Sequence, residues 1–406
     1  MPFTVWAFEE RSGLADALTP LAGAEASFDP PGGGARMLGT VAEDGHVTFV
    51  ADFQSGGGTV SVFDRDHVLV SRIGASPGDA PERPIALGKP AGDLVLFAPR
   101  LDEAVRRTSV EVKGALLSKR HPQSSIDLSA SGVEQLGALE TSEASYSLRA
   151  PRGRPFFILG HETRTLANAP QKVDNDLLGS FRIDMPALDA DATRDIDLPS
   201  AKALSTRTVR VRAELPRDAL SPFGDGTRAT VTVVSADSEV LLGPVKSAQP
   251  SADGRAFDLA MYLAETDIAP ERPLTRASLV AGDGSRSIRI EPGVAPDGAT
   301  WSEFLLPPMA TPSPAPIALT DPITFGYFPP GADIGIEVYA GTQLAWIIEG
   351  SAQPPTAPIK LPVPLEVRLP ALVAVSFIAR TDRVPLAPRG DIYRRTAISR
   401  DVIFRR

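Results

Sequence analysis

A two-residue rhythm of apolar side chains, broken by turns rich in glycine and proline, constrains this chain more than any other feature. The rhythm is clearest between positions 21 and 73, where Val47, Phe49 and Ala51 alternate with other residues in the segment GHVTFVADF. Side chains of a β-strand point alternately to its two faces, so this spacing places one set on a core. The interruptions PPGGG, EDG and SGGG break the ladder, because proline lacks an amide donor and glycine is costly to order. The segment therefore predicts four or five short strands and no helix.

The motifs PLAGAEASFD, GTVAEDGHVTF and GTVSVFDRDHVLV occur in this order within residues 1–75. Together they resemble the carboxypeptidase regulatory-like, or Cna-B (transthyretin-like), β-sandwich module. The matching positions are Ala22, Gly23, Ala24, Gly39, Thr40, Asp44, Gly45, Phe49, Val60 and Val62. The sequence departs from that family at His67 and Val68, where the family has its final aromatic residue, and it shows no Lys/Asn pair suited to an isopeptide crosslink. The resemblance implies a non-catalytic module of a secreted or surface protein.

The same pattern of short strands separated by turns continues to the end of the chain. With 406 residues, the chain is too long for one small sandwich. Its 39 prolines and 34 glycines exceed the roughly 12% average for the pair, as many turns between short strands require. The sequence predicts an all-β chain of tandem antiparallel β-sandwich domains of the immunoglobulin or transthyretin type. The expected domains are residues 1–90, 91–200, 201–312 and 313–406, with proline-rich linkers at 74–93 and 307–322.

Three segments give specific local predictions. The segment RPFFILGHETRT, from Arg154, is the most apolar strand candidate of its domain and is expected to be central. In TRTVRVRAEL, Val209 and Val211 alternate with Arg210 and Arg212, which predicts a strand with an apolar inner face and a basic outer face. The segment LDEAVRR predicts a short helix.

The formal charge of −9 and the sequence pI near 5.2 argue against nucleic acid as a partner, because phosphate neutralisation needs a basic face. Two segments are locally basic despite the negative net charge: RRTSVEVK, from Arg106, and the tail from Arg380. The chain has no cysteine, which excludes disulfides, cysteine-ligated zinc and a thiol nucleophile.

The N-terminal segment has no signal-peptide pattern, and no apolar run approaches the 18 residues of a transmembrane helix. No transmembrane segment is therefore expected. Export to the cell surface follows only from the family resemblance and assumes that a signal has been removed; a cytoplasmic location stays open.

No catalytic residue is predicted. The four histidines, His46, His67, His121 and His161, lack metal-binding spacing, and nucleophile-elbow, P-loop and dinucleotide motifs are absent. His46 and His67 are expected to be surface histidines with ordinary partners, with a contact between the two across strands as the alternative. A pair between His161 and Glu162 is a separate interpretation.

An acidic run supplies the candidate metal ligands Asp189, Asp191 and Asp195. Their spacing is that of the early positions of a calcium loop, but Arg194 and Ser200 stand where that loop needs glycine and glutamate. An EF-hand is excluded. A looser calcium site at a domain junction and a solvated acidic loop are the two interpretations, and no other cofactor is expected.

Trp301 and Tyr262 are the candidate ligand-binding residues, because exposed aromatic rings stack on sugars. Trp301 follows a turn, whereas Trp346 lies in an apolar run and is expected in a core.

The leading hypothesis is a non-catalytic structural, adhesive or protein-interaction protein of a bacterial exported or surface type, which binds a protein partner or its own copies through loops and sheet edges. One alternative is a carbohydrate-binding accessory module of a polysaccharide system. Another is an enzyme whose site is assembled between domains from carboxylates such as Glu162 and Asp174.

Overall fold

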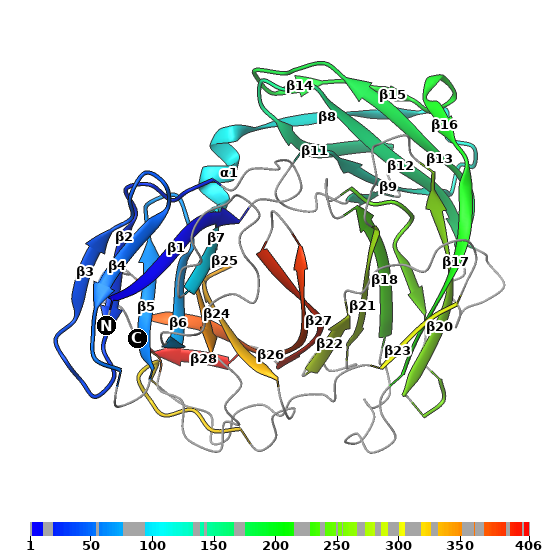
Figure 1. Cartoon of the computed structure of the whole chain (residues 1–406). Helices are drawn as coiled ribbons and strands as arrows, with labels where there is room; N and C mark the ends of the chain where they lie inside the picture. The colour runs from blue at the N-terminus through cyan, green and yellow to red at the C-terminus, as the bar shows by residue number, and fades with distance from the viewer. Residues whose placement is uncertain are drawn as a thin grey trace. The chain divides into compact units, whose positions relative to one another are not determined.

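The computed structural model is built almost entirely of β-strands, which confirms the all-β prediction (Figure 1). It divides into two compact units: the first comprises Met1–Arg11, Ala15–Ala104 and Pro308–Arg406, and the second Ser12–Leu14 and Val105–Pro307. The structure describes residues 2–10, 19–53, 57–75, 94–132, 139–141, 144–165, 175–214, 228–235, 240–248, 251–253, 255–265, 273–280, 286–290, 300–304, 318–325, 332–350, 361, 369–386, 390–399 and 402–405.

The N-terminal part of the first unit is a two-layer β-sandwich, as predicted. One sheet has the order β4(His46–Val50), β1(Pro2–Glu10), β7(Leu94–Pro99), and the facing strands are β3(Met37–Thr40), β2(Glu25–Asp29), β5(Gly58–Phe63) and β6(Leu69–Ala75). Both layers bury alternate side chains in one core, which includes Phe3, Val5, Phe28, Val47, Phe49, Val60 and Val62. The two-residue rhythm thus marks the inner faces of two sheets. β1 and β7 pair in parallel, while the other ladders of this sandwich are antiparallel.

The turn predicted at Asp44–Gly45 is present but does not close a hairpin. The amide of Gly45 donates to Ala42 O at 2.9 Å, the amide of Ala42 donates to His46 O at 2.8 Å, and Gly45 has a φ of +99°. β3 before the turn pairs with β2, whereas β4 after it pairs with β1. The turn therefore carries the chain from one layer of the sandwich to the other.

The C-terminal strands extend the second layer of this sandwich. β25(Gln343–Gly350) pairs in parallel with β6, from Trp346 opposite Leu69 to Gly350 opposite Ile73. Beyond it come β24(Asp333–Ala340), β26(Leu372–Leu386) and β27(Gly390–Ser399), with β28(Val402–Arg405) also on β26. Trp346 is fully buried, as expected, and its Nε1 donates to Ser71 Oγ at 2.9 Å. Ser71 Oγ in turn lies 2.7 Å from Ser61 Oγ.

The second unit contains a further sandwich. β11(Ser145–Pro151), β8(Ser109–Leu117), β14(Ala192–Thr193) and β15(Ile196–Asp197) form one layer. The other layer has the order β10(Leu139–Thr141), β9(Ser125–Ala130), β12(Phe156–Thr165), β13(Asn175–Met185), β16(Lys202–Leu204). The predicted apolar strand is therefore central, and Ile158 on β12 is fully buried in the core with Ile126 and Leu128. The short helix predicted before β8 is α1(Asp102–Thr108), and η1(Leu198–Ser200) is a single 3₁₀ turn.

The remaining strands of the second unit form two more sheets. One has the order β20(Ala256–Ala264), β17(Thr206–Glu214), β23(Thr300–Phe304), and the other the order β19(Lys246–Ala248), β18(Arg228–Ser235), β21(Pro273–Val280), β22(Arg286–Ile290). β17 and β20 pair antiparallel, whereas β17 and β23 pair in parallel. Most of both predicted linkers lies outside the described residues, and the boundaries of the four predicted domains stay predictions.

Candidate functional site

The outer face of β17 and β20 carries charged side chains and lies next to a hollow. Its cross-strand pairs are Thr208–Tyr262, Arg210–Ala260, Arg212–Asp258 and Glu214–Ala256. Arg210 binds Asp258 through two hydrogen bonds, Nε to Oδ1 at 2.6 Å and Nη2 to Oδ2 at 2.7 Å. This contact raises the pKa of the Arg210 guanidinium. Arg210 and Arg212 are exposed, as predicted, whereas the side chains of Val209 and Val211 lie outside the described residues. On the opposite face of β20, Met261 and Leu263 are buried.

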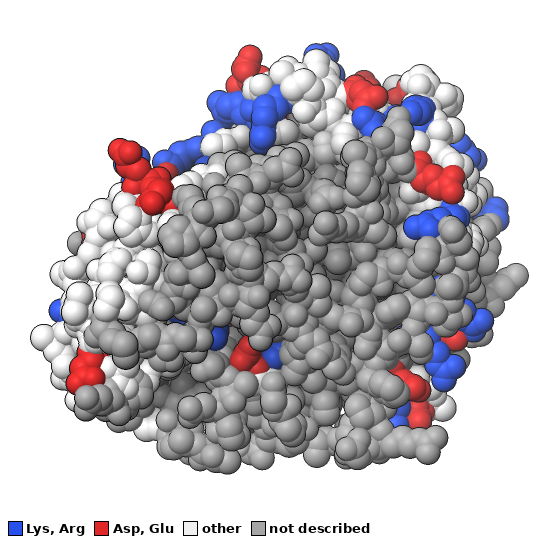
Figure 2. Space-filling model, in the orientation of Figure 1, with Lys and Arg blue, Asp and Glu red and all other residues white. Residues whose placement is uncertain are grey.

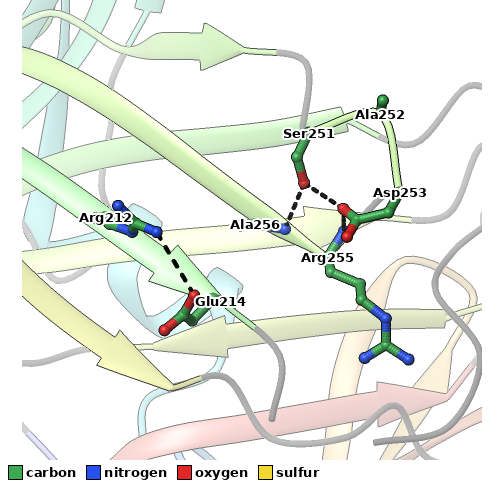
Figure 3. A pocket seen from close by; sticks show the side chains of 7 residues that line it. All are labelled: Arg212, Glu214, Ser251, Ala252, Asp253, Arg255 and Ala256. Atoms are coloured by element: carbon green, nitrogen blue, oxygen red, sulfur yellow. Dashed lines mark hydrogen bonds and ion pairs between the residues drawn. The ribbon is translucent and has the colours of Figure 1, made fainter. Parts of the chain in front are cut away.

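A hollow of about 700 Å³ opens where β17 ends and β20 begins (Figure 3). Its lining residues are Arg212, Glu214, Ser251, Ala252, Asp253, Arg255 and Ala256. Arg212 and Glu214 form an ion pair in which Nη2 and Oε2 lie 3.8 Å apart. Figure 3 shows the Arg255 guanidinium extending away from the turn that carries it.

The carboxylate of Asp253 forms hydrogen bonds within the turn beside this hollow. Its Oδ1 accepts from Ser251 Oγ at 2.6 Å and from the amide of Arg255 at 3.1 Å. Ser251 Oγ also accepts from the amide of Ala256 at 2.9 Å. The hydrogen bond from Ser251 is the main reason that the pKa of Asp253 is lowered. The hollow thus combines a fixed carboxylate with arginines, an arrangement suited to binding polar groups and without a nucleophile–base pair among its lining residues.

Both predicted ligand-binding residues lie in the sheet that borders the hollow. Tyr262 is half-buried on β20 opposite Thr208, and Trp301 lies on β23 opposite Val211. Their partners on β17 are three positions apart, so Tyr262 and Trp301 do not occupy one row across the sheet. Their role in ligand binding stays a prediction.

The predicted calcium ligands lie along one edge of β8. The Oδ1 atom of Asp191 accepts from the amide of Glu111 at 2.9 Å, and Oδ1 of Asp195 accepts from the amide of Ala115 at 2.8 Å. Asp189 is exposed in the preceding loop. Two of the three carboxylates therefore accept from backbone amides of β8. Across the described part of the chain, no group of three or more His, Cys, Asp or Glu side chains is arranged to hold a metal ion. The calcium site stays a prediction.

A buried polar seam joins the β9–β12–β13 sheet to residues 240–245 within the second unit. Leu241 is its centre: its amide donates to Ser129 Oγ, and its carbonyl accepts from Nε2 of His161, both at 2.9 Å. The amide of Val245 donates to Asp127 Oδ2 at 2.9 Å. Asp127, Ser129 and His161 are all buried, so this polar face of the sheet is covered by the 240–245 segment. We call these contacts the Leu241 seam.

The state of His161 follows from its burial in this seam. Burial lowers the pKa of His161 to about 4, against a smaller opposing effect of the hydrogen bond to Leu241 O. The ring is therefore neutral at pH 7, with the proton on Nε2 and with Nδ1 accepting from Ser180 Oγ at 2.9 Å. A neutral histidine held by two partners joins segments of the chain.

Glu162, the alternative catalytic carboxylate, is buried beneath the β8–β9 loop. Its Oε1 accepts from the amide of Arg120 at 2.8 Å, from the amide of His121 at 3.4 Å and from Ser124 Oγ at 2.5 Å. Three donors on one loop fix that loop on the carboxylate. His161 and Glu162 thus have separate partners, and Asp174 lies outside the described residues.

The first unit has its own buried charged group around His67. Nδ1 of His67 lies 2.8 Å from Asp64 Oδ1, and Nε2 lies 3.4 Å from Glu9 Oε2. Burial lowers the pKa of His67, but the hydrogen bonds to Asp64 and Glu9 outweigh it and raise the pKa to about 9. The ring is therefore a cation at pH 7 and ties the β5–β6 loop to β1. His46, by contrast, is a partly exposed histidine whose Nδ1 lies 2.5 Å from Asp44 Oδ1.

Sequence reasoning missed the residues that build the Leu241 seam. In SSIDLSAS, the polar residues Asp127 and Ser129 alternate with Ile126 and Leu128, as on any strand with one wet face. The segment EVLLGPVKSA that covers them falls within the next predicted domain, residues 201–312. An aspartate in the middle of a predicted strand is the one available signal, because buried carboxylates require partners.

Comparisons with known proteins do not assign a family. No family model matches the sequence, and no curated protein matches it. Among solved structures, the Bacillus anthracis TIE protein is similar at 9% identity and a TM-score of 0.18, over 75% of this chain and 50% of that one. The minor pilin GBS52 of Streptococcus agalactiae is similar at 10% identity and a TM-score of 0.16, over 51% and 97% of the two chains.

A third similar structure is the pilus adhesin SpaC of Lactobacillus rhamnosus GG, at 11% identity and a TM-score of 0.17, over 89% of this chain and 44% of that one. The chain thus spans about half the length of the TIE protein and less of SpaC. Similarities at these TM-scores carry no weight for the function of this chain. The β-sandwich of residues 1–75 is confirmed by its own strands, whereas its membership of the Cna-B family is not.

Among the described helices, none has the length and apolar character needed to cross a lipid bilayer.

Proposed function

We propose that this protein is a non-catalytic structural or adhesive scaffold of a bacterial exported or surface type, which binds its own copies or a protein partner through sheet edges and loops. The observation that carries the proposal is the Leu241 seam. Its buried polar side chains, Asp127, Ser129 and His161, all bind backbone groups of one segment. Such residues serve to hold strands and segments in fixed positions.

The energetics of the seam support a stiff connection. Each buried hydrogen bond adds about 0.5–1.5 kcal/mol, and an unmade one costs about 1–3 kcal/mol because the amide stays desolvated. Three such bonds at Leu241 and Val245 therefore make release of the segment costly. Glu162 fixes a loop in the same manner. Rigid loops and edges are what a binding scaffold has to present.

The bacterial and exported character of the proposal comes from the Cna-B-like motifs of residues 1–75. Modules of that family are mostly non-catalytic parts of secreted or surface proteins. The absence of cysteine is compatible with that setting and with a cytoplasmic one.

A candidate contact surface for a second copy lies on β26 and β28. Leu372 is 57% exposed and Ile403 is 60% exposed, although both are large apolar residues. The register places Leu372 opposite Arg405 and Ala374 opposite Ile403, so all four positions share one face. Adjacent exposed apolar side chains on a sheet favour association.

Sedimentation velocity of the purified chain over a wide concentration range tests the proposal. We expect a concentration-dependent dimer or larger species, and the double variant Leu372→Lys with Ile403→Lys is expected to lose it. Val50→Lys, which changes a 70% exposed residue on β4, is the matched control and should associate normally. A chain that stays monomeric throughout and binds no protein in pull-down experiments would contradict the proposed scaffold.

A further inference from the structure

The hollow at the end of β17 is lined by opposite charges that balance. Arg212 and Arg255 supply two positive charges. Glu214 and Asp253 supply two negative charges, and the lowered pKa of Asp253 keeps its carboxyl ionised at pH 7. Figure 2 shows blue and red side chains lying side by side at the right of the view, over β17 and β20. A lining without net charge has no field of one sign that would draw in a polyanion or a polycation.

Arg212 and Glu214 keep hydrogen-bonding capacity for a ligand. The two atoms of their ion pair, Nη2 and Oε2, lie 3.8 Å apart, which is longer than a hydrogen bond. The Arg212 side chain is 50% exposed and the Glu214 side chain 36% exposed, so a ligand can reach both. One side of the hollow therefore offers guanidinium donors and carboxylate acceptors next to each other.

The turn that lies across from the end of β17 holds its own carboxylate in place (Figure 3). Oδ1 of Asp253 accepts from Ser251 Oγ and from the amide of Arg255, and the amide of Ser251 donates to Ala256 O at 2.7 Å. Neither bond to the carboxylate uses Oδ2 of Asp253, so this oxygen is a second, fixed acceptor. A group that is already fixed loses little conformational freedom when a ligand binds to it.

The described lining narrows the kind of ligand. Its apolar members are the small residues Ala252 and Ala256, whereas a lipid or an apolar protein anchor needs a larger apolar surface. Stacking on nucleic-acid bases needs aromatic side chains, and the described lining contains none. A neutral molecule rich in hydroxyl groups fits better, because each hydroxyl both donates and accepts and needs neither net charge nor apolar contact.

We propose that this hollow binds the hydroxyl groups of a neutral carbohydrate. Neighbouring hydroxyls of a sugar ring accept from the Arg212 guanidinium and donate to the carboxylates of Glu214 and Asp253. The volume of about 700 Å³ lies in the range of pockets that take small ligands. Tyr262 and Trp301, the residues predicted for sugar stacking, are not part of the described lining. The site is separate from the β26–β28 contact surface and does not rest on the scaffold function proposed above.

A printed array of neutral, acidic and zwitterionic glycans, probed with the full chain, tests this proposal. We expect binding to at least one neutral glycan. Isothermal titration with that glycan should give an affinity that does not change with salt concentration, because the ligand carries no charge to be screened. The variant Arg212→Ala with Glu214→Ala keeps the net charge of the chain. It should bind about tenfold more weakly, because charge-assisted hydrogen bonds to the sugar are lost.

The matched control is Arg210→Ala with Asp258→Ala, which removes another neutral ion pair from β17 and β20 but leaves the described lining intact. It should bind the glycan like the original chain, and circular dichroism should show that both double variants are folded. Equal losses in the two variants would place binding outside the hollow and overturn the proposal. Binding of acidic or zwitterionic glycans alone, or of no glycan on the array, would overturn it as well.

Discussion

The two units join their parts in different ways, and the difference explains where polar residues are buried. In the first unit, β25 continues the sheet of β6, so the backbone groups of both strands pair with each other. The buried side-chain hydrogen bonds at this junction join the uncharged residues Ser61, Ser71 and Trp346, and the opposed residues Arg72 and Glu349 form an ion pair in which Nη1 and Oε2 lie 3.9 Å apart. In the second unit, residues 240–245 lie across a sheet face, and among the described backbone pairs the segment has one to β20, from the amide of Ala264 to Leu242 O at 2.6 Å. The side chains of Asp127, Ser129 and His161 bind backbone groups of Leu241 and Val245.

The comparison shows that the way in which two segments are joined determines which side chains are needed to satisfy their backbone groups. Strand addition satisfies the backbone by itself and leaves packing as the main contribution of the side chains. Face docking buries amide and carbonyl groups that only polar side chains of the sheet can satisfy. Variants at the two junctions should therefore differ in both the size and the kind of their effect.

The largest effect is expected from Trp346→Ala at the strand-addition junction. Truncating a fully buried tryptophan leaves a cavity and costs about 3–5 kcal/mol. Hydrogen-exchange mass spectrometry should show lost protection in β6 and β25, with peptides of β9 and β12 unchanged. Trp346→Phe keeps most of the packing and removes the hydrogen bond to Ser71, so a loss near 1 kcal/mol is expected from that bond. Equal losses in the two variants would show that packing is not the main contribution there.

A smaller effect, of about 1–3 kcal/mol, is expected from Asp127→Ala at the Leu241 seam. The change leaves the amide of Val245 buried without its acceptor, and an unmade buried hydrogen bond costs that much. Exchange protection should fall in the 240–245 segment and in β9, while β6 and β25 keep theirs. Asp127→Asn, which retains an acceptor oxygen, is the control and should recover most of the protection. No change in the alanine variant would mean that the seam does not hold the segment.

The third expected effect separates the two units by the pH dependence of their stability. His67 has a folded pKa near 9, above the ordinary value of 6.5, so its contribution is complete below pH 6.5 and is lost as pH rises through 9. His161 has a folded pKa near 4, so its contribution is complete above pH 6.5 and is lost as pH falls toward 4. The first unit should weaken on the alkaline side and the second on the acidic side.

Exchange protection measured in each unit from pH 4 to 9 checks this expectation. His67→Gln should flatten the alkaline response of the first unit, and His161→Gln the acidic response of the second. His46→Gln, at a partly exposed position, should alter neither. Parallel pH responses in the two units would contradict the assignment.

Local patterns in the sequence predicted local structure well. The alternation of Val47 and Phe49, the apolar strand at 156–165 and the short helix before β8 all appear as expected. The turn at Asp44–Gly45 is also present, yet its flanking strands pair with other partners. A turn sequence fixes the local backbone, whereas the choice of partner strand depends on how two layers pack.

Strand and side-chain partners far apart in the chain could not be predicted from the sequence, for a physical reason. Nothing in QLAWIIEG distinguishes a strand that pairs within its own segment from one that adds to β6, because both require the same alternation. The sequence pattern around Asp127 is the same for an aspartate on a solvent-exposed sheet face as for one covered by a docked segment. The charged partners of His67 could not be predicted either, since Glu9 lies 58 positions away and reaches it only across the sandwich.

The pairing of β6 with β25 has a mechanical consequence. Strands from the beginning and the end of the described chain, β1 and β28, both belong to the first unit, and the whole of residues 105–307 is inserted between its two parts. A pulling force applied between β1 and β28 is therefore borne by the β6–β25 ladder, which bridges those parts. We therefore expect the two parts of the first unit to separate under such a force only after this ladder has sheared.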